Sequence, residues 1–195
     1  MSRIFLIPLI ALTVLIFAGC SRTPVSSIYK LTQFEPETVD LAELRAAVRV
    51  PEELRPKQVT LIIGARTHDT GPAQKQMFFL EPDPVQSNPP NLKKEAKPGT
   101  RHYVFRIAPG DMPQAERFRR EIVAYRANGG SKGGGSLSVG ADACRIGQLP
   151  AGRLLLTTYL KFDGRHGYFP VVRNIDMRSL VDENTLREKI PQCPA

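Results

Sequence analysis

The sequence predicts an α+β fold: a mostly antiparallel sheet built from hairpins, one long amphipathic helix packed on it, and a short C-terminal helix. Several short runs rich in β-branched and aromatic residues alternate apolar and polar positions, with turn residues between them. One stretch alone, residues 111–126, repeats apolar residues at three- and four-residue spacing. Many strands with few helices indicate an α+β domain.

The first 108 residues of the chain contain five candidate strands. Residues 28–40 alternate weakly and are either a first strand or part of a tether. Residues 44–50 place small or branched apolar residues between two arginines, which favours a strand after a short turn capped by Asp40. After a polar turn at 52–56, residues 59–66 and 76–81 predict a hairpin, and a further strand is expected at 102–108.

A proline-rich segment, residues 82–99, separates the last two of these strands. It carries prolines at 82, 84, 89, 90 and 98 and lysines at 93, 94 and 97. Loops of this length are either functional or mobile, and the composition favours a solvated surface loop without a function of its own.

The long helix is predicted to begin after Asp111, with Pro113 in its first turn and Gln114 completing a capping box. Asn128 and Gly129 provide its end. Its apolar face is expected to comprise Met112, Ala115, Phe118, Ile122 and Tyr125.

The last third begins with a glycine-rich connection, 129–136, whose order of Lys132 and glycines does not match a phosphate-binding loop. A strand is predicted at 137–144. Residues 153–162 and 168–175 then form a predicted hairpin around Asp163 and Gly164, and Pro170 suggests an edge strand or a bulge. Asp182 is expected to cap a final helix over 183–190.

The N-terminal segment indicates export. Arg3 precedes an apolar run, residues 4–16, and Ala18, Gly19 and Cys20 follow Phe17, which together are the parts of a secretory signal peptide. The Ala-Gly-Cys ending resembles the lipobox of bacterial lipoproteins, with Phe17 in place of the usual leucine. That resemblance implies removal of residues 1–19, a diacylglycerol on Cys20, and a palmitate-type acyl group on the new amino terminus.

Under this interpretation the chain has three parts: a cleaved signal peptide at 1–19, a lipidated tether at 20–37 and one globular domain at 38–195. Two alternatives remain for the apolar run, a transmembrane anchor and a cleaved signal without lipid; Pro8 and the shortness of the run weigh against the anchor. Ser21 resembles the outer-membrane sorting pattern of lipoproteins, so we expect the outer membrane facing the periplasm rather than the inner membrane. The body of the chain resembles uncharacterised envelope lipoproteins of Gram-negative bacteria, a likeness that supplies no activity and no site.

Composition and cysteines agree with an exported domain. The 195 residues include 42% hydrophobic and 24% charged residues, ordinary values for a globular protein. The net charge of +8 suits anionic membranes or envelope polymers; nucleic acid is not an expected partner, because the cations are scattered along the chain. With Cys20 lipidated, Cys144 and Cys193 form a pair expected to be a disulfide in an oxidising compartment, the alternative being two buried free thiols.

No catalytic pattern is visible. His68, His102 and His166 have no triad or metal-ligand partner at a recognisable spacing, so neither an enzyme, a metal nor a cofactor is expected. The expected function is that of a non-catalytic, membrane-anchored envelope lipoprotein that binds another protein, as an accessory or structural subunit. The alternative is a lipid- or anionic-glycan-binding transport or maintenance factor, and a hydrolase is a distant third.

Overall fold

The computed structural model describes residues 39–70, 72–85, 89–131, 135–162 and 167–194. They form one seven-stranded sheet in which every pairing is antiparallel, in the order β5-β2-β3-β4-β1-β6-β7. The strands are β1 (Arg45–Pro51), β2 (Leu54–Ala65), β3 (Gln74–Pro82), β4 (Thr100–Ile107), β5 (Ser136–Arg145), β6 (Leu155–Lys161) and β7 (Phe169–Asp176).

The predicted antiparallel sheet and both predicted hairpins are confirmed. β2 pairs with β3 through Val59–Ala65, and β6 pairs with β7, which is an edge strand with two irregularities in its register. The turn predicted at Asp163 and Gly164, like the possible strand at 28–40, lies at least in part outside the described residues.

One boundary prediction was wrong. β2 begins at Leu54 instead of residue 59, because Leu54 and Pro56 pair with Arg145 and Ala143 of β5. A bulge between Pro56 and Gln58 allows the proline within the strand. The turn between β1 and β2 is therefore only two residues, Glu52 and Glu53.

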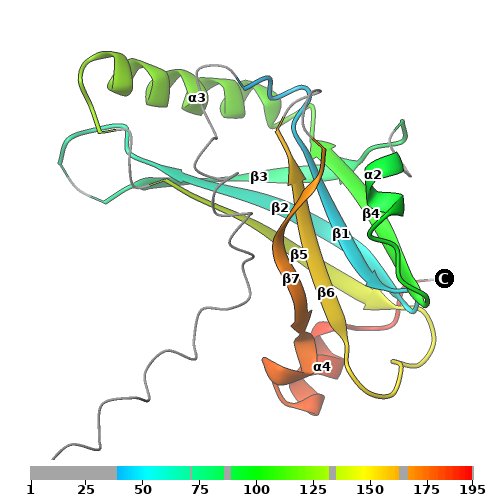
Figure 1. Cartoon of the computed structure of the whole chain (residues 1–195). Coiled ribbons are helices and arrows are strands. Elements are labelled where there is room, and N and C mark those ends of the chain that lie inside the picture. The colour runs from blue at the N-terminus through cyan, green and yellow to red at the C-terminus, as the bar shows by residue number, and fades with distance from the viewer. Residues whose placement is uncertain (1–38, 71, 86–88, 132–134, 163–166, 195) are drawn as a thin grey trace, which may run out of the picture.

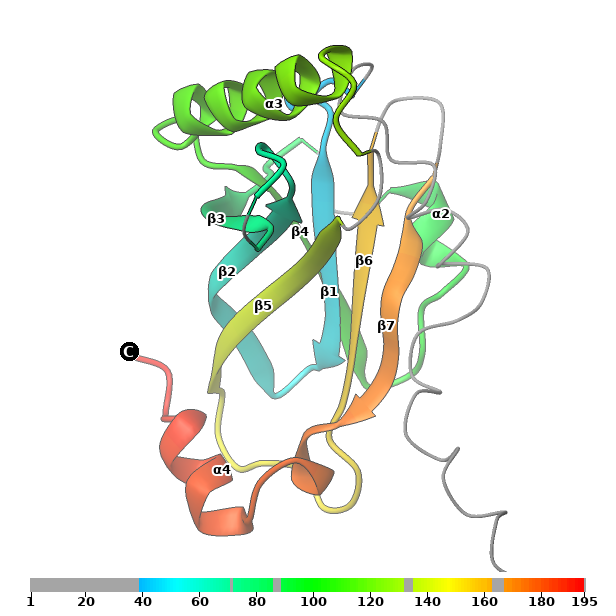
Figure 2. The same cartoon turned by 90° about the vertical axis from the view of Figure 1, so that its left-hand side faces the viewer.

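The sheet curls into a half-barrel around the main core, with a helix at each end (Figures 1 and 2). The alternation predicted for β1 is present: Ala46, Val48 and Val50 lie in the main core, whereas Ala47 belongs to a second, smaller cluster. The opposite, outer face of β1 thus carries Arg45 and Arg49 as well as Ala47.

The long helix α3 (Met112–Ala127) crosses one end of the half-barrel (Figure 1). The amphipathic helix predicted from the sequence is not supported, because only Ala115, Phe118 and Ile122 are buried and the helix is polar on average. The predicted capping box is also wrong: the Asp111 carboxylate accepts a hydrogen bond from the Phe79 amide of β3 instead of from its own helix.

Two short helical elements occupy the other end. The 3-10 turn η1 (Met177–Ser179) follows β7, and α4 (Glu183–Lys189) begins at Asp182, whose side chain accepts hydrogen bonds from the amides of Asn184 and Thr185 as predicted. In the described part of the chain, none of the helices has the length and apolar content needed to span a bilayer.

The segment between β3 and β4 is exposed at most of its described residues, as the sequence suggested, but Asp83 and Leu92 are buried against the sheet. Its described residues, 83–85 and 89–99, hereafter the strap, contain the helix α2 (Pro90–Lys93) and lie against the outer face of the sheet (Figure 2). Leu92 is 1% exposed and packs with Ala47, Val104 and Tyr159. The polar composition of the segment did not predict this contact, because only the single leucine of α2 packs on the sheet.

Candidate functional site

The strap covers three rows of side chains on the outer face of β4, β1 and β6. Cross-strand register fixes these rows, since each residue from Arg45 to Arg49 has one partner on β4 and one on β6. The apolar middle row, under Leu92, lies between two charged rows centred on Arg45 and Arg49. At one end Arg45 pairs with the Asp83 carboxylate of the strap; at the other, Arg49 pairs with strap residue Glu95.

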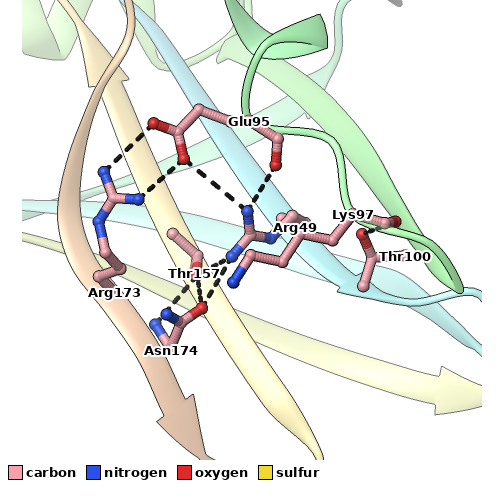
Figure 3. Close-up of polar contacts among 7 residues, drawn as sticks. All are labelled: Arg49, Glu95, Lys97, Thr100, Thr157, Arg173 and Asn174. Atoms are coloured by element: carbon pink, nitrogen blue, oxygen red, sulfur yellow. Dashed lines mark hydrogen bonds and ion pairs between the residues drawn. The ribbon is translucent and has the colours of Figure 1, made fainter.

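Arg49 is the centre of the most connected polar site in the described residues, and it is only 2% exposed. Its Nη1 donates to the backbone oxygen of Glu95 at 2.6 Å. Its Nη2 donates to Thr157 Oγ1 at 3.0 Å and to Asn174 Oδ1 at 2.8 Å (Figure 3). One guanidinium therefore joins β1 to the strap, to β6 and to β7, and we call this site, with Arg173, the Arg49 cluster.

A second arginine completes the cluster from β7. Arg173 Nη1 and Nη2 donate to the two carboxylate oxygens of Glu95 at 2.8 and 3.3 Å, while Arg49 Nη1 lies 3.9 Å from Glu95 Oε2. The hydrogen bond from Arg173 is the largest influence on this carboxyl and lowers the pKa of Glu95, with the charges of Arg173 and Arg49 acting in the same direction. Glu95 is therefore ionised at neutral pH.

A bulge explains why two consecutive residues of β7 reach the same site. Neighbours in a regular strand face opposite sides of the sheet, but the register between β6 and β7 shifts from Leu156–Ile175 to Thr158–Val172. Asn174 adopts a φ of +52°, a left-handed conformation that asparagine tolerates better than most residues. Its amide donates to Thr157 Oγ1 at 3.0 Å, and Arg173 and Asn174 both reach Arg49 or its partner Glu95.

The strap returns to the sheet through a tight turn beside the cluster. The Thr100 hydroxyl and amide donate to the backbone oxygen of Lys97, at 2.7 and 3.1 Å (Figure 3). Gly99 has a φ of +67°, which requires glycine for an unstrained turn, and its carbonyl accepts from the Glu52 amide at 3.1 Å. This end of the strap is thereby held to the turn between β1 and β2.

Two titratable side chains lie beside Arg49 on neighbouring strands. His102 is the β4 partner of Arg49, and its ring centre is 5.6 Å from that of Tyr159. Burial lowers the pKa of His102, and the charge of Arg49 lowers it further, so its imidazole is neutral at pH 7. Burial raises the pKa of Tyr159 to about 12. His102 Nε2 and the Tyr159 hydroxyl have no hydrogen-bond partner of normal geometry within the described residues.

The geometry of the Arg49 cluster is that of a clamp. Its guanidinium groups hold one carboxylate, one backbone carbonyl, one hydroxyl and one amide, all of them protein atoms from three separate segments: the strap, β6 and β7. A buried charge arranged in this way has its partners already in place, which is the condition for tolerating an ion pair in the interior. The cluster fixes the strap to the sheet.

The structure joins two of the three residues to which the sequence analysis assigned a chemical role. Cys144, at the end of β5, and Cys193, in the C-terminal tail, form the predicted disulfide with a Cα–Cα distance of 4.9 Å. Cys20 lies outside the described residues, as does His166, and His68 is exposed in a turn. Among the described residues, no group of three or more His, Cys, Asp or Glu side chains is placed to hold a metal ion.

Sequence reasoning missed the Arg49 cluster entirely. Arg49 occupies a polar position of an alternating strand, which normally predicts exposure to solvent, and Glu95 lies in a lysine-rich segment. Their partners Thr157, Arg173 and Asn174 lie more than 60 residues away along the chain from Glu95. The only available signal was that a single leucine, Leu92, interrupts the polar segment three residues before Glu95.

Comparison of the chain with protein-family models, with curated proteins and with solved structures finds no match in any of the three.

Proposed function

We propose that this chain is a non-catalytic lipoprotein of the bacterial envelope, anchored through Cys20 in the outer membrane and facing the periplasm. Its domain binds an extended segment of another envelope protein, as an accessory or structural subunit. The ending of the N-terminal apolar run in Ala18, Gly19 and Cys20 supports the anchor. The Cys144–Cys193 disulfide supports an oxidising compartment.

The observation that carries partner binding is the open edge of β5. This strand is ten residues long, ends the sheet, and has one charged residue, Asp142, before its last position. Natural proteins protect such edges with charges, prolines or covering loops. In the described part of the chain only the C-terminal tail, at Arg145, hydrogen-bonds to the backbone of this edge. A long edge that is free over the rest of its length suits strand addition by a partner, in which backbone hydrogen bonds supply the affinity.

The register identifies which backbone groups a partner would meet. The Arg145 amide donates away from β2, to the Pro191 carbonyl, so the groups of every second residue before it also point away from β2. These residues are Leu137, Val139, Ala141 and Ala143, and none of them has a further backbone partner in the described part of the chain. The outer face of nearby β3 exposes Met77 and Phe79 at 51% and 48%, which would extend the contact.

A proline at Ala141 tests this edge. The substitution Ala141→Pro removes one outward amide and leaves the inward hydrogen bonds to β2 in place, whereas Ala141→Ser keeps the amide and serves as the matched control. A photo-crosslinker at Ala143 is expected to capture one stoichiometric partner in native membranes, and Ala141→Pro is expected to abolish that product. Crosslinking that survives in Ala141→Pro would exclude β5 as the docking edge.

The anchor is tested by intact mass of the chain purified from its native membrane. Wild type is expected to show residues 20–195 plus a diacylglycerol and an acyl chain, and Cys20→Ala is expected to lack both. An unprocessed mass would identify the apolar run as a membrane span instead, and an unlipidated mature mass would identify a free exported domain.

The second candidate function is binding of a lipid or an anionic glycan, as a transport or maintenance factor. The net charge of +8 supports it, and so does a cavity lined by arginines near α4. Salt-dependent binding of lipopolysaccharide without a stoichiometric protein partner would favour this candidate over the first.

A further inference from the structure

A second arginine-rich site lies at the end of the half-barrel opposite α3, where η1 and α4 meet the connection between β5 and β6 (Figures 1 and 2). Here Arg145, Arg178 and Arg187 line a cavity of about 480 Å³, together with Glu183 and Pro150. Three guanidinium groups face a single carboxylate, so the side chains of this arginine cavity carry an excess of positive charge.

Most of the donors in the arginine cavity have no hydrogen-bond partner among the described residues. Each guanidinium offers five N–H groups. Within that part of the chain, Arg145 donates only to the Gly147 carbonyl, at 3.3 Å, and Arg187 donates only to Glu183 Oε1, at 3.4 Å.

Arg178 uses two of its nitrogens, for the Pro150 carbonyl at 3.0 Å and for Glu183. The Nε atoms of Arg145 and Arg178 are buried and have no partner among the described residues. Because these Nε atoms have almost no accessible surface, the contacts open to a ligand in the cavity are the terminal nitrogens of the guanidinium groups.

The backbone beneath the arginines is held in place. The Arg145 amide donates to the Pro191 carbonyl and its carbonyl accepts from the Cys193 amide, both at 2.9 Å, and the disulfide lies directly beside it at Cys144. The Arg178 amide donates to the Asp176 carboxylate at 3.2 Å. Fixed attachment points lower the entropy lost when a ligand binds.

We propose that the arginine cavity binds the phosphate group of an anionic ligand. Guanidinium groups match phosphate oxygens with paired hydrogen bonds, and several around one cavity suit an anion of more than one charge. The volume exceeds what one phosphate group fills, so the ligand carries a further moiety next to it. This inference rests on the second function proposed above, to which it gives a site and a ligand class.

Glu183 is the internal competitor of this ligand. Its carboxylate bridges Arg178 and Arg187, as a bound anion would, and the hydrogen bond from Arg178 lowers its pKa so that it stays ionised. Neutralising Glu183 therefore strengthens anion binding, whereas neutralising either arginine weakens it. Opposite effects of substitutions at neighbouring residues on anion affinity would distinguish a specific site from general electrostatic attraction.

The test is calorimetric titration of the full chain in neutral detergent with two probes. Inorganic pyrophosphate represents free phosphate groups, and glycerophosphoglycerol represents the phosphodiester of a lipid headgroup.

Arg178→Gln and Arg187→Gln are expected to weaken binding about tenfold each, equivalent to one charge-assisted hydrogen bond. Glu183→Gln is expected to tighten binding a few-fold. Arg120→Gln on the exposed surface of α3 is the control, with the same charge change and no expected effect.

The outcomes are distinct. Tighter binding of glycerophosphoglycerol identifies a lipid headgroup as the source, and tighter binding of pyrophosphate identifies a free phosphate. If Arg120→Gln weakens binding as much as Arg178→Gln, the attraction is general and the site is wrong. If neither probe binds the wild-type chain, the site is wrong, although lipopolysaccharide binding at another surface could still support the function. Should Arg178→Gln fail to fold, Glu183→Gln and Arg187→Gln, both exposed, keep the test decisive.

Discussion

The molecule contains two sites in which arginines surround one glutamate, and they differ in how completely the arginines are paired. In the Arg49 cluster, Arg49 is 2% exposed and its terminal nitrogens contact three other segments of the chain. In the arginine cavity, the Arg187 side chain is 69% exposed and most N–H groups have no partner among the described residues. Arginine therefore serves as a structural clamp where protein atoms accept hydrogen bonds from its N–H groups, and as a candidate ligand site where they do not.

The largest predicted effect concerns the disulfide beneath the arginine cavity. Replacing both Cys144 and Cys193 by serine is expected to lower the free energy of unfolding by about 4 kcal/mol, because a closed loop of this length restricts the unfolded chain. Urea unfolding of the two proteins measures the change. Phosphate binding should also weaken, since the covalent link between Cys144, next to Arg145, and the C-terminal tail is lost. An unchanged affinity would show that the C-terminal tail holds Arg145 without the disulfide.

The next effect concerns the Arg49 cluster. Arg49→Ala is expected to lower the free energy of unfolding by about 3 kcal/mol, because it leaves Asn174 and Thr157 without their buried donor. The estimate is at the low end for a broken buried pair, since Arg173 still neutralises Glu95. Arg187→Gln, in the other site, is the contrasting variant. A change below 1 kcal/mol in urea unfolding would contradict the description of a clamp.

A smaller effect depends on pH. The pKa of His102 is below its ordinary value of 6.5 in the folded chain, so the unfolded chain binds this proton more readily. Stability is therefore expected to fall as the pH drops below 6.5 towards the folded pKa. His102→Gln should remove the dependence of stability on pH just below pH 6.5, where the titration of carboxylates contributes little to it. Equal slopes for both proteins in thermal unfolding would contradict the assignment.

The smallest effect is on the stability of the cavity variants. Arg187→Gln is expected to change the free energy of unfolding by less than about 0.5 kcal/mol, because exposed ion pairs contribute little. Arg187→Gln would thus change the affinity for the anion and leave the free energy of unfolding nearly unchanged, whereas Arg49→Ala would lower the free energy of unfolding. A loss of stability comparable to that of Arg49→Ala would show that both sites are structural.

The sequence was sufficient for what depends on neighbouring residues. Alternation predicted the strands around Val48, Ile62 and Tyr159, and the count of cysteines predicted the disulfide. The prediction from sequence failed where contacts between residues far apart in the chain determine the structure. The strap packs because Leu92 meets Ala47 and Tyr159, and both arginine sites assemble from segments that only the folded sheet brings together. No local pattern distinguishes the buried Arg49 from the exposed Arg187.

The place of β1 in the sheet has a consequence for the order of folding. β1 is the first strand in the described chain, yet it lies between β4 and β6 and pairs with residues as distant as Lys161. The sheet therefore cannot close in the order of synthesis, and contacts so far apart predict refolding in roughly milliseconds to seconds. A chain that ends before β6 should remain unfolded. If the chain is exported through a translocation channel, as proposed above, this delay would keep it in the extended state that the channel admits.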